Sequence, residues 1–346
     1  MRNILYSLVF IAALTLFLSL GTNAFAAAPP DQPSNMISSD ITAAWEKAGA
    51  QSGWMNIQTG TWDDSVTGLP GEIPAFRFNQ WTPGAISPLP PPNQGFGLDM
   101  ANTNITDSGL KELSQFTQLQ MLKLDLTKVT DAGMKQLTGL TQMQALDLDG
   151  TPVGDTGLKE LVGLTQLQWL DLTGTQVTDA GLKQLAGLTK LQYLNLWQTQ
   201  VTDAGLKQLA GLTQLQTLNI ENTHVTDAGL KYLAGFTQLE TLNLDSTQVT
   251  DAGLKELAVL TQLQELHLGN TQVTDAGLKQ LSANTQLQTL DLGETQVTDV
   301  GLKELAGFTQ LQELNLFDDT HVTDAGVAEL QKALPNLQIT GFPPSQ

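Results

Sequence analysis

Side chains that could bind a partner recur along this sequence at one constant interval of twenty-four positions. Trp169 and Tyr193 are one interval apart, and Trp197 follows Tyr193 closely. If equivalent positions lie on adjacent strands, the rings of Trp169 and Tyr193 are about 4.8 Å apart. Exposed aromatic rings with polar neighbours are typical of binding hot spots. The alternative is that the two rings stack only to stabilise the surface of a sheet.

Acidic and amide side chains accompany these rings at the same interval. Asp147, Asp171 and Asn195 form one column, and Asp149 lies beside it. We therefore predict that one set of residues contacts a partner: Trp169, Tyr193, Trp197, Asp147, Asp149, Asp171 and Asn195.

The paired acids also raise the question of metal binding or catalysis. Like charges on Asp147 and Asp171 would raise one pKa or recruit a cation. Calcium, however, needs several converging oxygen ligands, and acid–base catalysis needs a pocket that excludes water. A regular sheet face offers neither, and the histidines lie in different coils: His224, His267 and His321. We predict no catalytic residue, no metal site, no cofactor and no enzyme activity.

The elements that position these side chains belong to one repeated phrase, Val-Thr-Asp-Ala-Gly-Leu-Lys. Its Asp recurs at the same constant interval from Asp107 to Asp299, and the next copy, Asp324, arrives one position late. Internal repetition at this period is the signature of a solenoid, in which each unit buries its apolar side chains only against its neighbours.

Within one unit, the apolar residues change their spacing. A spacing of three, as one apolar face of a short helix requires, is followed by the L-x-x-L-x-L spacing of a short strand: Leu230, Leu233 and Phe236, then Leu239, Leu242 and Leu244. Asp227 or Thr226 is placed to cap the helix start. Strands on one wall and thicker helices on the other force the stack to curve. We predict an α/β horseshoe with a concave parallel sheet and convex helices.

The pattern L-x-x-L-x-L-x-x-T-x-V-T-D-A-G-L-K-x-L resembles the leucine-rich repeats of bacterial proteins abundant in planctomycetes. It is also similar to the cysteine-containing repeats of eukaryotic F-box proteins, with Thr in place of Cys or Asn and with no F-box-like segment before it. The resemblance implies a right-handed leucine-rich-repeat solenoid of ten repeats over residues 98–340, followed by a tail at 341–346. The family is known mainly as interaction scaffolding.

Two other repeat columns have structural explanations. One is a column of threonines at the repeat interval, from Thr127 to Thr295, whose hydroxyls we expect to donate to backbone carbonyls where the strand bends. The other is a column of lysines at the same interval, from Lys111 to Lys303, which we expect to lie on a solvated helix face rather than to form a basic binding stripe.

Asn284 stands where the other coils carry Leu or Phe. A buried Asn must find partners or cost about 1–3 kcal/mol, so we expect the stack to be locally weak there.

Residues 27–97 differ from the repeats. They hold four of the six tryptophans, a helix expected over 39–50, and a Pro-rich connector over 88–92. Without a cover the first coil would expose its leucines, so we predict that this segment caps the solenoid. A separate binding module is the alternative.

The segment 1–26 resembles an export signal. Arg2 precedes an apolar run from Ile4 to Leu20, and cleavage is expected after Ala26. An uncleaved anchor is the alternative, but this run would span only about 25 Å as a helix, short of a ~30 Å hydrocarbon core. No later segment is apolar enough to insert in a membrane.

The net charge of −19 argues against nucleic-acid partners, and the chain has no cysteine.

These observations favour a monomeric scaffold, secreted or in the periplasm or cell envelope, that binds a protein or peptide on its concave face. The acidic surface suggests a basic or polar partner. Two other functions fit the same pattern, because aromatic platforms also stack on sugars and solenoids also pack into layers. These are polysaccharide or cell-wall binding, and a structural role in the envelope.

Overall fold

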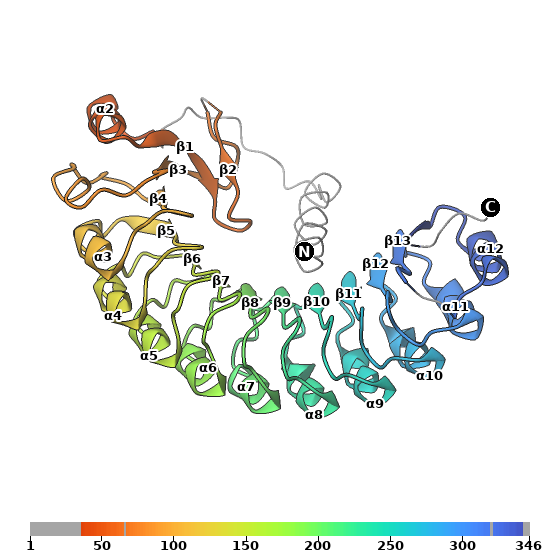
Figure 1. Ribbon diagram of the computed structural model, residues 1–346. Helices are drawn as coiled ribbons and strands as arrows, with labels where there is room; N and C mark the ends of the chain where they lie inside the picture. The colour runs from red at the N-terminus through yellow and green to blue at the C-terminus, as the bar shows by residue number, and fades with distance from the viewer. Residues whose placement is uncertain (1–35, 66, 319–320, 342–346) are drawn as a thin grey trace.

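The computed structural model of the chain describes residues 36–65, 67–318 and 321–341. The predicted signal peptide over 1–26 and most of the predicted tail lie outside these residues. The described part forms one open arc, with strands on the inner side and helices on the outer side (Figure 1). The predicted horseshoe with a concave parallel sheet is confirmed.

A single sheet of fourteen strands lines the arc, in the order β14 to β3 followed by β1 and β2. Neighbours are parallel from β3 to β14, whereas β1 is antiparallel to both β2 and β3. The strands are β1 Gln51–Asn56, β2 Trp62–Asp63, β3 Glu72–Arg77, β4 Phe96–Asp99, β5 Leu119–Lys123, β6 Ala145–Asp147, β7 Trp169–Asp171, β8 Tyr193–Asn195, β9 Thr217–Asn219, β10 Thr241–Asn243, β11 Glu265–His267, β12 Thr289–Asp291, β13 Glu313–Asn315 and β14 Gln338–Thr340.

Short helices form the convex side. They are α2 Ser39–Lys47, α3 Asp107–Leu113, α4 Asp131–Met134, α5 Asp155–Leu158, α6 Asp179–Leu185, α7 Asp203–Gln208, α8 Asp227–Leu230, α9 Asp251–Leu254, α10 Asp275–Leu278, α11 Asp299–Glu304 and α12 Asp324–Ala333. Several of them continue as 3₁₀ turns: Lys135–Leu137, Lys159–Leu161, Lys231–Gly235, Lys255–Val259, Lys279–Ala283 and Leu305–Gly307. Each of these helices begins at the Asp of the repeated phrase, except α2.

The repeated Asp links one coil to the next. Thr226 caps α8, because its hydroxyl accepts a hydrogen bond from the backbone N–H of Ala228. Asp227 instead accepts two hydrogen bonds from Thr250 of the following coil, from its N–H at 2.8 Å and its hydroxyl at 2.7 Å. Of the two caps expected from the sequence, Thr is therefore the one used.

The leucines are buried between the coils, in one core that runs the length of the arc. The threonine column behaves as predicted, since the Thr247 hydroxyl donates to the Leu244 carbonyl at 2.6 Å and its equivalents do the same. These bonds turn the backbone out of the strand while keeping the hydroxyl satisfied in a buried position. The repeat therefore provides a rigid, regular sheet on which the concave side chains vary.

The residues before the repeats cover the first coil. Trp45 of α2 stacks on Phe76 of β3 with ring centroids 4.3 Å apart, and it also contacts Phe96 of β4 and Phe116 of the first repeat. The Trp45 indole donates to the Pro90 carbonyl at 2.9 Å. Helix α2 begins at Ser39 as expected but ends at Lys47, three positions before the predicted end. These contacts join the segment to the repeat core as one packed body.

Candidate functional site

Side chains on the concave face stand in register from coil to coil. Trp169 pairs with Tyr193 and Asp171 with Asn195 in the β7–β8 register, without any shift. The two aromatic rings stack with centroids 4.8 Å apart and planes 8° from parallel. The predicted distance of about one strand spacing between the rings of Trp169 and Tyr193 is therefore confirmed.

The expectation that Trp169 is exposed is wrong. Only 6% of Trp169 is exposed, because the turn between β1 and β2 lies over it. A Cβ on Gly60 of this turn would be 3.6 Å from the Trp169 ring, and the Gly60 carbonyl accepts a hydrogen bond from Lys123. Figure 1 shows this hairpin bending over the concave side. While the hairpin is in place, Trp169 has almost no surface to offer a partner.

The predicted acidic residues form a network beside the hairpin. Asp147 lies 3.5 Å from the Lys123 ammonium, and Asp171 accepts a hydrogen bond from Asn195 at 3.0 Å. Burial and the neighbouring Asp171 raise the pKa of Asp147, and burial also raises the pKa of Asp149 to about 6. The structure therefore brings these acids together, but in a largely buried group that contains its own cation.

A separate open groove lies farther along the concave face. It has a volume of about 390 Å³, and Trp197 lies at one end of it and Phe317 at the other. Trp197 is half-buried and Phe317 is 44% exposed. Of the seven residues predicted to contact a partner, Trp197 alone lines this groove.

The groove is acidic. Among the described residues that line it, four are acidic and none is basic: Glu221, Asp245, Asp291 and Glu294. Burial raises the pKa of Glu221 to about 7, and burial with the charges of Asp291 and Glu221 raises the pKa of Asp245 well above its ordinary value. Burial is the main cause of both shifts, and neighbouring acidic groups add to it.

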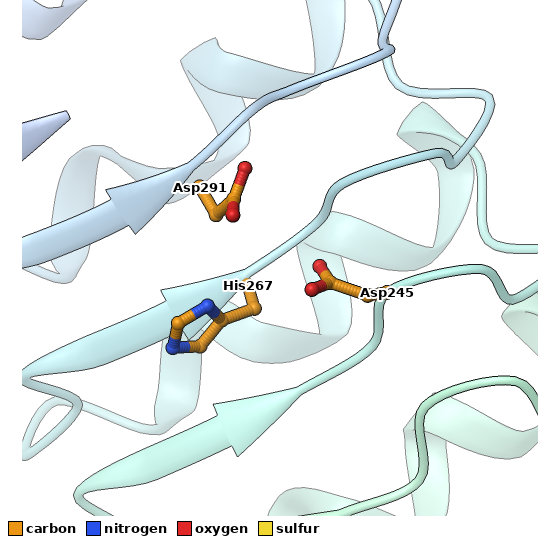
Figure 2. A group of neighbouring side chains, drawn as sticks. All are labelled: Asp245, His267 and Asp291. Atoms are coloured by element: carbon orange, nitrogen blue, oxygen red, sulfur yellow. The ribbon is translucent and has the colours of Figure 1, made fainter. Parts of the chain in front are cut away.

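Three side chains that could ligate a metal ion lie close together, as Figure 2 shows: Asp245, His267 and Asp291. Of these, Asp245 and Asp291 line the groove. One ligand atom from each lies within 4.8 Å of the other two. Burial lowers the pKa of His267, which favours the neutral imidazole. This group was not predicted from the sequence. His267 and Asp291 occupy the same repeat position as Asp171, whereas Asp245 belongs to the turn after its strand. His224 and His321 lie elsewhere.

Within the described ranges, no helix combines the length and the apolarity needed to cross a lipid bilayer.

Models of leucine-rich repeats match much of the chain. One described as a leucine-rich repeat matches residues 165–225, and another of two copies matches 261–307. A third leucine-rich-repeat model matches residues 98–114, 140–162 and 237–258. No curated protein matches the chain.

Solved structures share the fold. An internalin from Listeria monocytogenes superposes with a TM-score of 0.59 at 26% identity, covering 72% of this chain and 74% of the internalin. A second internalin from the same species has 34% identity and a TM-score of 0.49, covering 58% of this chain and 80% of that chain. A leucine-rich-repeat protein from Leptospira interrogans has a TM-score of 0.53 at 20% identity, covering 76% and 75% of the two chains. With the repeat matches and the shared arc of strands and helices, the chain is a leucine-rich-repeat protein.

Proposed function

We propose that this protein binds a basic segment of a partner protein in the acidic groove on its concave face, outside the cytoplasm. Leucine-rich-repeat proteins generally mediate protein–protein interactions and are typically scaffolds without catalytic activity. The observation that carries the proposal is the composition of the groove, which has four carboxylates and no basic residue among its described lining. The export-like sequence before residue 27 supports the location.

The two aromatic side chains at the ends of the groove supply the apolar contacts that a purely electrostatic site lacks. Trp197 and Phe317 flank the acidic floor, so an extended peptide could place aliphatic or aromatic side chains on them and lysine or arginine between them. Large aromatic anchors contribute most to the affinity of such interfaces, whereas the surrounding charges mainly increase the association rate and specificity.

Affinity capture from the protein's own cell envelope, followed by mass spectrometry, would identify the partner. Trp197→Ala should weaken its binding by about tenfold or more, since truncating an aromatic anchor typically costs about 2 kcal/mol. Glu221→Gln should slow association and reduce the dependence of binding on salt. Tyr232→Ala and Glu304→Gln, on the convex side, are the matched controls and should leave binding unchanged.

Two results would contradict this proposal. One is a captured protein whose affinity is the same for Trp197→Ala, Glu221→Gln and the unmodified chain. The other is selective retention of the protein on insoluble polysaccharide with no protein captured, which would instead favour the glycan-binding alternative.

A further inference from the structure

The group formed by Asp245, His267 and Asp291 has a geometry beyond what peptide binding requires. Asp245 comes from the turn after β10, whereas His267 and Asp291 end the adjacent strands β11 and β12 (Figure 2). Their ligand atoms lie within 4.8 Å of one another, on a sheet whose neighbouring strands pair without a shift. Three side chains from adjacent coils therefore each bring one possible ligand atom into the same small region.

The space between the two carboxylates is open because residue 269 is glycine. A Cβ at Gly269 would be 3.2 Å from Asp245 Oδ1 and 3.4 Å from Asp291 Oδ1. The equivalent positions of five earlier coils carry side chains: Asp149, Thr173, Trp197, Glu221 and Asp245. The backbone does not demand glycine here, since the left-handed residue of this coil is the next one, Asn270, with φ 52°. The missing side chain therefore leaves room between the carboxylates, independently of their charge.

The charge of the group also differs from that of the other acidic cluster on the concave face. Lys123 lies 3.5 Å from Asp147 in that cluster. Among the described residues, no lysine or arginine forms an ion pair with Asp245 or Asp291. Two neighbouring carboxylates without such a partner favour a bound cation.

Backbone groups hold the two carboxylates in place. The Gly269 N–H donates to Asp245 Oδ1 at 2.6 Å, and the Gly293 N–H donates to Asp291 Oδ1 at 2.8 Å. The side-chain amide of Asn315 also donates, to Asp291 Oδ2 at 2.8 Å. Such hydrogen bonds fix the orientation of metal ligands and increase their affinity.

We propose that Asp245, His267 and Asp291 bind one zinc ion in the groove, with a fourth coordination position facing the open side. An imidazole nitrogen together with carboxylate oxygens suits zinc, whereas calcium and magnesium prefer oxygen ligands alone. Zinc bonds to nitrogen and oxygen are about 2.0–2.2 Å long, so binding draws the three ligand atoms inward by small side-chain rotations. This site goes beyond the proposed function and does not depend on it.

The test is calorimetric titration of the purified full chain with Zn²⁺, with native mass spectrometry to count the bound ions. His267→Asn and Asp291→Asn introduce the residue that Asn243 and Asn315 already provide in the same column, so both variants should fold. Each should weaken zinc binding by more than about tenfold. His224→Gln removes a histidine outside the group and inserts the residue found at Gln200 and Gln248, and it should bind zinc like the unmodified chain.

The expected result is one Zn²⁺ per chain, bound more tightly than Ca²⁺, with the loss confined to variants of the three ligands. Trp197→Ala should lose partner capture but keep zinc binding, which separates a failure of this site from a failure of the proposed function. The site is overturned if no saturable zinc binding occurs, if His267→Asn binds zinc unchanged, or if His224→Gln weakens binding as much as His267→Asn.

Discussion

At the scale of single residues, the two tryptophans of the predicted contact set have different environments. Trp169 is stacked on Tyr193 and covered by the β1–β2 turn, whereas Trp197 is half-buried at the end of the groove. Burial makes the first a stabilising residue, and accessibility makes the second the residue that we propose contacts a partner.

Trp169→Ala should therefore lower the free energy of unfolding by about 3 kcal/mol, because it empties the space beneath the hairpin and leaves Tyr193 unstacked. Trp197→Ala should lower it by less than about 1 kcal/mol. Urea denaturation followed by circular dichroism measures both. Equal losses for the two variants would mean that the hairpin does not cover Trp169 in solution.

Asn284 is a second residue whose position affects stability. It is fully buried, and its amide nitrogen donates to the carbonyls of Leu257 and Leu260 at 3.0 and 2.9 Å. Its amide oxygen has no partner among the described residues. The two carbonyls already accept backbone hydrogen bonds, from the N–H groups of Leu260 and Leu263, so they lose little if Asn284 is replaced.

Asn284→Leu should raise the free energy of unfolding by about 1 kcal/mol, since it removes an unsatisfied buried oxygen and restores the side chain of the neighbouring coils. In hydrogen exchange, the amides of residues 255–300 should be better protected in this variant. The converse change, Leu260→Asn, should be destabilising. A loss of stability in Asn284→Leu would show that its two hydrogen bonds outweigh the unpaired oxygen.

At the scale of the repeated element, Asp, Thr and Gly form one contact between coils. Asp203 accepts hydrogen bonds from the Thr226 N–H and hydroxyl, both at 2.8 Å. A Cβ on Gly229 would clash with Asp203 Oδ1. The glycine of the repeated phrase therefore provides room for the carboxylate of the preceding coil.

Gly229→Ala should lower the free energy of unfolding by about 1–3 kcal/mol, because the added methyl group displaces Asp203 and breaks its bonds to Thr226. Gly187→Ala is the matched control, since no atom lies within 4 Å of its added Cβ, and it should be neutral or slightly stabilising. Chemical denaturation of the two variants compares them. Similar losses would rule out the close approach as the reason for this glycine.

The sequence predicted the elements that depend on local spacing. Leu242 and Leu244 placed a strand, and the constant repeat interval placed Trp169 against Tyr193. The hairpin over Trp169 could not be predicted, because residues 36–97 follow no period and their contacts with the repeats depend on the folded shape. The group of Asp245, His267 and Asp291 was missed because Asp245 comes from a turn. In addition, the absence of a side chain at Gly269 leaves space between the two carboxylates only when the three coils are stacked. The domain boundary at residue 98 stays a prediction.

At the scale of the whole molecule, the buried carboxyl groups make stability depend on pH. Burial raises the pKa of Glu221 and of Glu265 to about 7, from an ordinary value of 4.5. A carboxyl group with a raised folded-state pKa binds more protons in the folded than in the unfolded state, so its stabilising effect is complete below pH 4.5 and is lost as the pH rises through 7.

The urea midpoint should consequently be higher at pH 5 than at pH 8. A Glu221→Gln, Glu265→Gln double variant should show a smaller difference between these two pH values, because it removes two of the groups that titrate in this window. Measurements at constant ionic strength and with a metal chelator isolate the effect. A midpoint that rises from pH 5 to pH 8 would contradict the assignment.

Strands β5 to β13 pair without a shift in register, so whole coils could be added or removed between them. The hairpin at Gly60 covers the concave face at β7, and Phe317 lines the groove after β13. Loss or duplication of one whole coil, such as residues 203–226, would keep every type of contact between neighbours and change the distance between the hairpin and Phe317 by about 4.8 Å. The length of concave surface available to a ligand therefore depends on the number of coils. Homologous recombination between near-identical repeats would change that length by one coil at a time and keep the contacts of the core.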